Sequence, residues 1–169
     1  GDERIFAPVQ RYVYALDAKT GKPVPQFGQD GRIDVQADLR GGPEGISAAV
    51  GHAPVIYKDL VIFAGRTGES LPAAPGDVRA YDARTGKLKW FFQAVPNDLH
   101  DWDLQLSPIY TKSGGRDILL EAGKMGFVYA LDPAAPPQPA PWRSGTHLAD
   151  ALRRAGVHRL YADHGWSDA

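Results

Sequence analysis

Three aspartates lie close together in residues 97–103, NDLHDWD, and their carboxylates could carry chemistry. A positioned carboxylate can accept a proton from a reacting group while a neighbouring cation holds the reacting oxygen. In an extended strand, Asp101 and Asp103 would point to the same side, and two such carboxylates can share a hard cation. A solvated acidic loop without chemistry is the alternative interpretation of Asp98, Asp101 and Asp103.

Two further segments place charged side chains beside glycines. Lys124 lies in GKMG, residues 123–126, where a cation could stabilise negative charge that develops on a bound group. An exposed turn lysine explains the same pattern. Glu69 follows Arg66 in GRTGE, residues 65–69, and a carboxylate is the kind of oxygen ligand that calcium takes. A glutamate on a surface loop is the alternative here.

The composition excludes several other kinds of site. The chain has no cysteine, which excludes disulfides, thiolate metal sites and cysteine nucleophiles. The net charge is −1, with basic and acidic residues interspersed, which argues against nucleic acid or an anionic membrane as the main partner. No metal-ligand spacing connects the histidines, which are His52, His100, His147, His158 and His164.

Short apolar runs between turn signals predict an all-β fold. The turn signals are rich in Gly, Asp, Ser and Lys and occur at 58–59, 84–87 and 113–116. Seven runs rich in Val, Ile, Tyr and Phe have the length and composition of strands. These predicted strands are 12–16, 54–57, 60–64, 78–81, 88–93, 118–121 and 127–131.

An internal repeat narrows the all-β prediction to a β-propeller. Residues 14–22, YALDAKTGK, are matched by 79–87, RAYDARTGK, and a decayed third copy is YALDPA at 129–134. In each copy a strand ends at an Asp that can cap the next turn, and the first two copies supply a Gly that can take positive φ. The Asp residues are 65 and 50 residues apart, enough for a four-stranded blade and a loop. Trp90 would then pack against the neighbouring blade.

The repeat pattern divides the chain into two parts. Residues 1–132 are predicted to form a partial propeller with tryptophan-docking-type repeats. Residues 133–169 are predicted to be a proline-rich linker and a tail of uncertain order. A short helix is expected in this tail at 147–155, with Thr146 as its N-cap and Gly156 as its stop.

With these repeats in view, residues 4–132 resemble the quinoprotein dehydrogenases that use pyrroloquinoline quinone (PQQ). Residues 54–62, PVIYKDLVI, and 74–82, APGDVRAYD, are similar to the branch related to glucose dehydrogenase. Residues 97–103 resemble the catalytic segment of this family. Residues 122–132, AGKMGFVYALD, resemble the segment that contacts the cofactor.

The resemblance implies a role for each candidate residue. Asp101 would be the general base that removes the hydroxyl proton of the substrate, and Lys124 would contact the quinone oxygens. Arg66 would be a further contact to PQQ. Glu69, with Asp101 and Asp103, would ligate calcium, which acts as a Lewis acid on the quinone. Lanthanide-using members have an extra Asp at the spacing of Asp103, so a lanthanide is the alternative metal.

The sequence also departs from the family pattern. The family has a calcium-binding Asn between the positions of Glu69 and Asp101, but the only asparagine here, Asn97, lies too close to Asp101. His100 stands where relatives commonly have Trp. A second hypothesis therefore stays open, in which the chain is a non-catalytic propeller scaffold that binds other proteins.

The resemblance also implies partners and a location. The substrate would be a small alcohol or sugar, the electrons would pass to a respiratory acceptor, and the compartment would be the periplasm. The family propeller closes a ring of about eight blades, so another chain could supply the missing blades. We expect the chain alone to be a poor catalyst.

Overall fold

The structure is a computed structural model that describes residues 2–39, 47–68, 74, 76–95, 102–104, 106–124 and 127–134. This part of the chain is built from strands and contains no helix, and so no helix that could cross a membrane. Its strands are β1 (Arg4–Val9), β2 (Tyr12–Asp17), β3 (Arg32–Asp34), β4 (Ala48–Ala49), β5 (Val55–Tyr57), β6 (Leu60–Ala64), β7 (Arg66–Thr67), β8 (Gly76–Asp82), β9 (Leu88–Val95), β10 (Ile109–Ser113), β11 (Arg116–Ala122) and β12 (Val128–Leu131).

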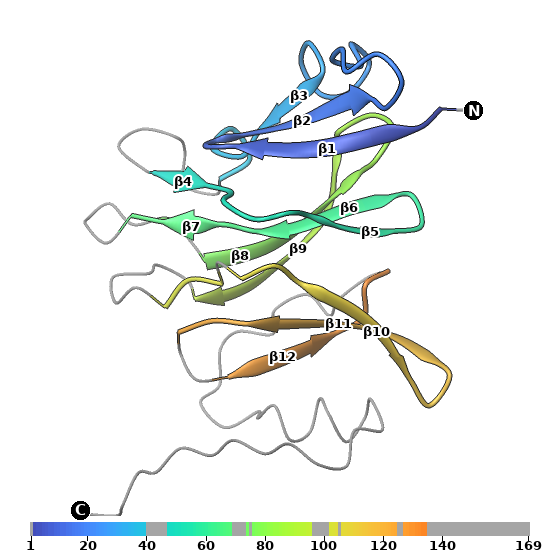
Figure 1. Ribbon diagram of the computed structural model, residues 1–169. Helices are drawn as coiled ribbons and strands as arrows, with labels where there is room; N and C mark the ends of the chain where they lie inside the picture. The colour runs from blue at the N-terminus through green and yellow to red at the C-terminus, as the bar shows by residue number, and fades with distance from the viewer. Residues whose placement is uncertain are drawn as a thin grey trace, which may run out of the picture.

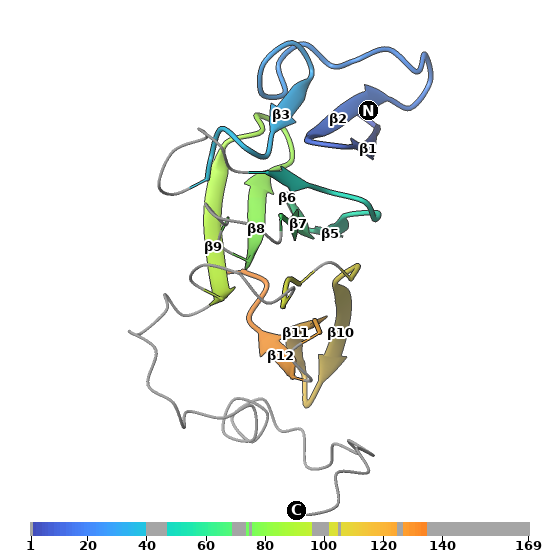
Figure 2. The same cartoon turned by 90° about the vertical axis from the view of Figure 1, so that its left-hand side faces the viewer.

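Three antiparallel sheets lie one above another (Figures 1 and 2). The first sheet has the order β1-β2-β3, the second β5-β6-β8-β9, and the third β10-β11-β12. A small fourth sheet pairs β4 with β7 and lies beyond the end of β6. Neighbouring strands in the three large sheets follow one another along the chain, apart from the excursion through β7 between β6 and β8. This up-and-down order within each sheet is the arrangement of a propeller blade.

The repeated turn has the construction that its sequence predicts. After β2, Asp17 Oδ1 accepts hydrogen bonds from the Thr20 N–H (2.8 Å) and the Thr20 hydroxyl (2.8 Å). After β8, Asp82 Oδ1 accepts the same two bonds from Thr85, at 2.8 and 3.0 Å. Gly86 has a φ of 70°, which glycine adopts without steric cost. In the decayed third copy, Asp132 Oδ1 accepts a hydrogen bond from the N–H two residues later, that of Ala134, at 2.8 Å. Asp17 and Asp82 accept the corresponding bonds from Lys19 and Arg84.

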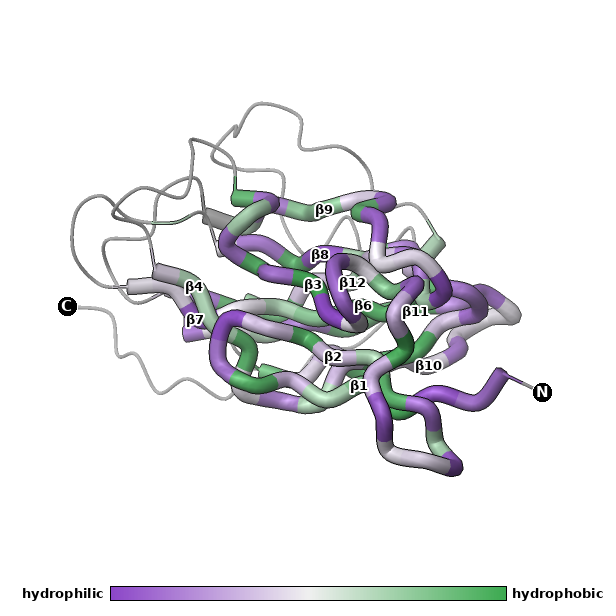
Figure 3. Tube along the Cα trace, turned by 90° about the horizontal axis from the view of Figure 1, so that it is seen from above, coloured by the Kyte–Doolittle hydropathy of each residue, from purple (hydrophilic) through white to green (hydrophobic). Residues whose placement is uncertain are grey.

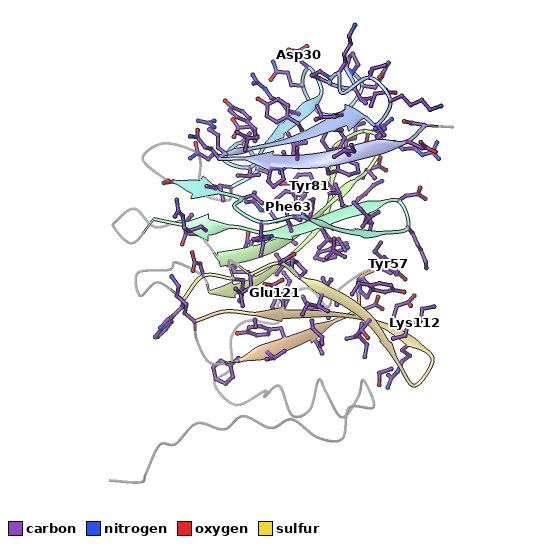
Figure 4. All side chains as sticks on the ribbon, viewed as in Figure 1. Asp30, Tyr57, Phe63, Tyr81, Lys112 and Glu121 are labelled. Carbon is purple, nitrogen blue, oxygen red and sulfur yellow. The ribbon has the colours of Figure 1, made fainter. Side chains whose placement is uncertain are left out.

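One hydrophobic core lies between the first and second sheets. Alternation along β2 turns Val13 and Ala15 inward, and both are fully buried against residues of β6 and β8. Phe63 and Tyr81 stack there with ring centroids 5.2 Å apart (Figure 4). In Figure 3 the hydrophobic stretches lie along the strands, whereas hydrophilic residues dominate the turns near the N-terminus.

A second core lies between the second and third sheets. Trp90 of β9 is 6% exposed and belongs to one buried cluster with Leu119 and Leu131 of the third sheet. Its indole N–H donates to the carbonyl of Pro133 at 3.2 Å. The prediction that Trp90 packs against the neighbouring sheet is therefore confirmed.

Polar groups close one end of this second interface. Tyr57 of β5 and Tyr110 of β10 both donate hydroxyl hydrogen bonds to Asp117 of β11, at 2.8 and 2.6 Å. The hydrogen bond to Asp117 raises the pKa of Tyr110 to about 12, and the two hydroxyls lower the pKa of Asp117. Lys112 Nζ lies 3.5 Å from the same carboxylate. These contacts connect strands of different sheets.

All seven predicted strands are present, with bounds shifted by a few residues at most. Strands β1, β3, β4, β7 and β10 were not predicted. The second sheet has four strands, while the described residues give three strands each to the first and third. The expected tail helix at 147–155 lies outside the described residues, as does most of 133–169.

Candidate functional site

The candidate site is built at the end of the sheets where β6 continues into β7. Gly65 joins the two strands, and a Cβ at this position would lie 3.3 Å from the carbonyl oxygen of Ala49. This close approach allows β7 to pair with β4, with Arg66 opposite Ala49 and Thr67 opposite Ala48. The pairing fixes the direction of the Thr67 N–H.

Asp103 is the buried carboxylate of this site. It is fully buried, and its Oδ2 accepts a hydrogen bond from the backbone N–H of Thr67 at 3.2 Å. Its Oδ1 lies 3.7 Å from Nζ of Lys124, whose side chain is 42% exposed. A buried charge is stable only when it is paired and hydrogen-bonded. These two contacts join the segment 102–104 to β7 on one side and to the end of β11 on the other.

The backbone approach at Gly123 explains how Lys124 reaches Asp103. A Cβ on Gly123 would lie 2.7 Å from the carbonyl oxygen of Asp103 and 2.8 Å from Cδ2 of Leu104. Only a residue without a side chain allows the end of β11 to lie this close to the segment 102–104. Gly123 therefore positions the lysine that follows it.

Arg66 adds a second cation at the same end of the sheets. Its side chain is exposed, and it directly precedes Thr67, the residue that binds Asp103. The arrangement thus presents a buried carboxylate with two basic side chains nearer the surface. Such a site can bind an anionic group and stabilise negative charge that develops on it.

The structure brings together part of the predicted site. Asp103 and Lys124 form an ion pair, and Arg66 lies one residue from the Asp103 contact. Asp101 and Glu69 lie outside the described residues, so their placement stays a prediction. Within the described ranges no three His, Cys, Asp or Glu side chains gather into a metal site.

Two contributors were not predicted, Thr67 and Gly123. Thr67 acts through its backbone N–H, so its side-chain type carries no signal. Gly123 follows directly after β11, and a glycine at the end of a strand can mark a close backbone approach. That signal was present in the sequence.

Comparison with known proteins gives the family. A family model described as "PQQ: Glucose/ethanol/alcohol dehydrogenase, beta-propeller domain" matches residues 1–96 and 82–135. The chain belongs to this family of quinoprotein dehydrogenases. The family assignment agrees with the resemblance seen in the repeats and with the all-strand fold.

Among the curated relatives, the quinoprotein glucose dehydrogenase of Gluconobacter oxydans (strain 621H) is 28% identical over 170 residues, covering 96% of this chain and 20% of the relative. The dehydrogenase subunit of a quinone-dependent alcohol dehydrogenase from Acetobacter aceti is 40% identical over 89 residues, covering 53% and 11%. The crystal structure of quinohemoprotein alcohol dehydrogenase from Comamonas testosteroni matches with a TM-score of 0.38 and 17% identity, covering 81% of this chain and 33% of that one. The quinoprotein chain described here thus spans a fifth or less of the two curated relatives.

Proposed function

We propose that this chain contributes part of the cofactor and substrate site of a PQQ-dependent dehydrogenase that oxidises a hydroxyl group of an alcohol or an aldose. The observation that carries the proposal is the Lys124–Asp103 ion pair, held in place by the close approach of Gly123. Family membership supports the cofactor, and the names of the relatives support the two substrate classes.

The residues at this site fit a quinone that carries carboxylates. Lys124 and Arg66 supply two cations with exposed side chains, and Asp103 holds Lys124 in one place. Bound PQQ would supply a two-electron acceptor. Lys124 would stabilise the negative charge on the quinone oxygens, because a preorganised cation stabilises charge without reorganising during the reaction.

Asp101 is the proposed general base. It directly precedes the segment 102–104, which Asp103 anchors to Thr67 and Lys124. A carboxylate in this position could take the hydroxyl proton of the substrate. The mechanism thus assigns charge stabilisation to Lys124 and proton removal to Asp101, with Asp103 as the residue that positions both.

Calcium is the proposed metal, with Glu69 and Asp101 as its ligands and Asp103 as a third. Carboxylate oxygens are suitable ligands for calcium. A metal ion at Asp103 would share the carboxylate with Nζ of Lys124, which lies 3.7 Å from Oδ1. Since Lys124 shares Asp103, we propose that Asp103 is the weakest of the three ligands, which favours calcium held mainly by Glu69 and Asp101 over a lanthanide that depends on Asp103.

The wider setting of the proposal follows from the family. The substrate would be a small alcohol or sugar, and the electrons would pass to a respiratory acceptor in the periplasm. The described sheets do not form a closed ring (Figure 1), and another chain could supply the missing blades.

Reconstitution with PQQ and calcium tests the proposal. We expect the chain to bind PQQ, measured by titration calorimetry, and the affinity to fall at least tenfold in Lys124→Ala. Lys112→Ala is the matched control, because Lys112 also pairs with a carboxylate, Asp117 at 3.5 Å, but at the other end of the interface. Its affinity should equal that of the wild type. No binding by the wild type, or equal losses in both variants, would refute the proposal and favour a non-catalytic scaffold.

A further inference from the structure

Glu121 is a carboxyl group buried between the second and third sheets. It lies on β11, and its side chain is on the same strand face as Leu119, two residues earlier, which packs into the second core. Figure 4 shows Glu121 between the two sheets, away from Tyr57 and Lys112. The residue is 2% exposed, although glutamate is rarely buried without a charged partner.

The surroundings of this carboxyl group are apolar. Neither carboxyl oxygen makes a well-formed hydrogen bond in the described part of the chain. The second sheet contributes seven residues to the buried hydrophobic cluster that it shares with the third sheet, namely Tyr57, Ile62, Ala64, Val78, Ala80, Trp90 and Ala94. The hydroxyl of Tyr57 donates to Asp117. Burial in these surroundings raises the pKa of Glu121 to about 9, and the nearby N–H of Ala122 opposes only part of this increase.

Among the described residues, the titratable neighbours of Glu121 do not supply it with a counter-ion. Tyr129 of β12 lies opposite Glu121 in the register, and burial raises the pKa of its phenol too. Asp117 shares the strand face but binds Tyr57 and Tyr110. Lys124, two residues beyond the end of β11, pairs with Asp103 of the segment 102–104. On the β10 side the register ends at the pair Ile109–Leu120, so β10 places no residue opposite Glu121.

We propose that the protonation state of Glu121 controls the packing between the second and third sheets, and we call this residue the latch. As a neutral acid it packs within the apolar interface, whereas as a carboxylate it must be hydrated. Ionisation therefore loosens the packing of β11 and β12 on the second sheet. The latch depends on burial and on the absence of a counter-ion among the residues that the structure describes, and it operates independently of any cofactor.

The direction of the pH dependence follows from proton linkage. Glutamate titrates near 4.5 when unperturbed and near 9 in the folded chain, so the folded state binds an extra proton between these values. The contribution of Glu121 to stability is then complete below about pH 4.5 and is lost as the pH rises towards about 9. In Glu121→Gln the side chain stays neutral, so this loss disappears.

Two measurements on the full chain test the latch. The ratio of the unfolding constants of wild type and Glu121→Gln should rise by up to tenfold per pH unit between about pH 5 and 9. Glu3→Gln, at an exposed position on the chain, should follow the wild type throughout. In infrared spectra, the wild type at pH 7 should show the band of a protonated carboxylic acid, which Glu121→Gln lacks and which disappears on alkaline titration.

The infrared titration keeps the proposal testable even if the glutamine variant does not fold, because the wild type alone must show the band and its loss. Parallel pH profiles of wild type and Glu121→Gln would overturn the latch. Wild-type spectra with only carboxylate bands at pH 7 would overturn it as well.

Discussion

At the scale of single residues, Asp82, the aspartate that ends β8, makes several polar contacts within and beside one short turn. Asp82 accepts hydrogen bonds from the backbone N–H and the hydroxyl of Thr85, and Lys89 lies 3.3 Å from its other oxygen. The backbone bond from Thr85 is the largest cause that lowers the pKa of Asp82 to about 2, and the Thr85 hydroxyl and Lys89 add to it. The carboxylate is therefore a stabilising charge.

We expect Asp82→Asn to lower the free energy of unfolding by about 1–2 kcal/mol near neutral pH, because charge-assisted hydrogen bonds are lost. Since the folded pKa is depressed, the contribution of Asp82 is complete above about pH 4 and is lost as the pH falls towards about 2. Urea unfolding at several acidic pH values should therefore show that the free energy of unfolding falls less steeply with decreasing pH in the variant than in the wild type.

Asp59→Asn is the control for this prediction. Asp59 is 80% exposed and its contact to Arg84 is 4.0 Å long, so its replacement should change stability little. If the free energy of unfolding depended on acidic pH in the same way in Asp82→Asn and in the wild type, the Asp82 carboxylate would not stabilise the turn.

The separation of two residues along the chain decides which contacts could be predicted from the sequence. The bonds of Asp17 and Asp82 reach only two or three residues along the chain, so local sequence determines them. The bond from Thr67 N to Asp103 spans 36 residues, and no local pattern encodes it. The role of Lys124 came from the family resemblance, and the structure adds its buried partner.

At the scale of strands, the predicted elements are those with dense apolar runs. Strand β1 contains Pro8, which weakens a strand pattern, and β10 has the mostly polar sequence IYTKS. The strands β4 and β7 have two residues each, too few to show a period. These strands form because neighbouring segments pair with them, which is a property of the tertiary structure.

The junction between β11 and the segment 102–104 supports a second prediction. Gly123→Ala should lower the free energy of unfolding by about 1–3 kcal/mol, because the new methyl group would overlap the backbone of Asp103. Hydrogen exchange of the β11 amides should accelerate, as the Lys124–Asp103 contact depends on this approach. Gly51→Ala is the control, since a Cβ on Gly51 would meet no atom of the described residues within 4 Å. Similar stability of the two variants would contradict the packing argument.

At the scale of the whole molecule, the chain provides three stacked sheets and spans a fifth or less of the two curated relatives compared above. We therefore expect the chain alone to bind PQQ but to turn over substrate at least a hundredfold more slowly than a complete quinoprotein dehydrogenase. A dye-linked assay with alcohols and aldoses, run beside such an enzyme, measures this ratio. Turnover comparable to that of the complete enzyme would contradict the expectation.

The two copies of the repeated turn differ in one contact that matters for comparing sequences. Gly21 and Gly86 have φ values of 67° and 70°, yet a Cβ on Gly86 would meet Gly28 N at 2.6 Å, whereas one on Gly21 would meet nothing within 4 Å in the described part of the chain. In the first copy, only the positive φ favours glycine. In the second copy, Gly86 must also leave room for the backbone of Gly28. Two repeats that align well therefore differ in the substitutions that they tolerate. We expect residues other than glycine to be accepted more readily at position 21 than at position 86.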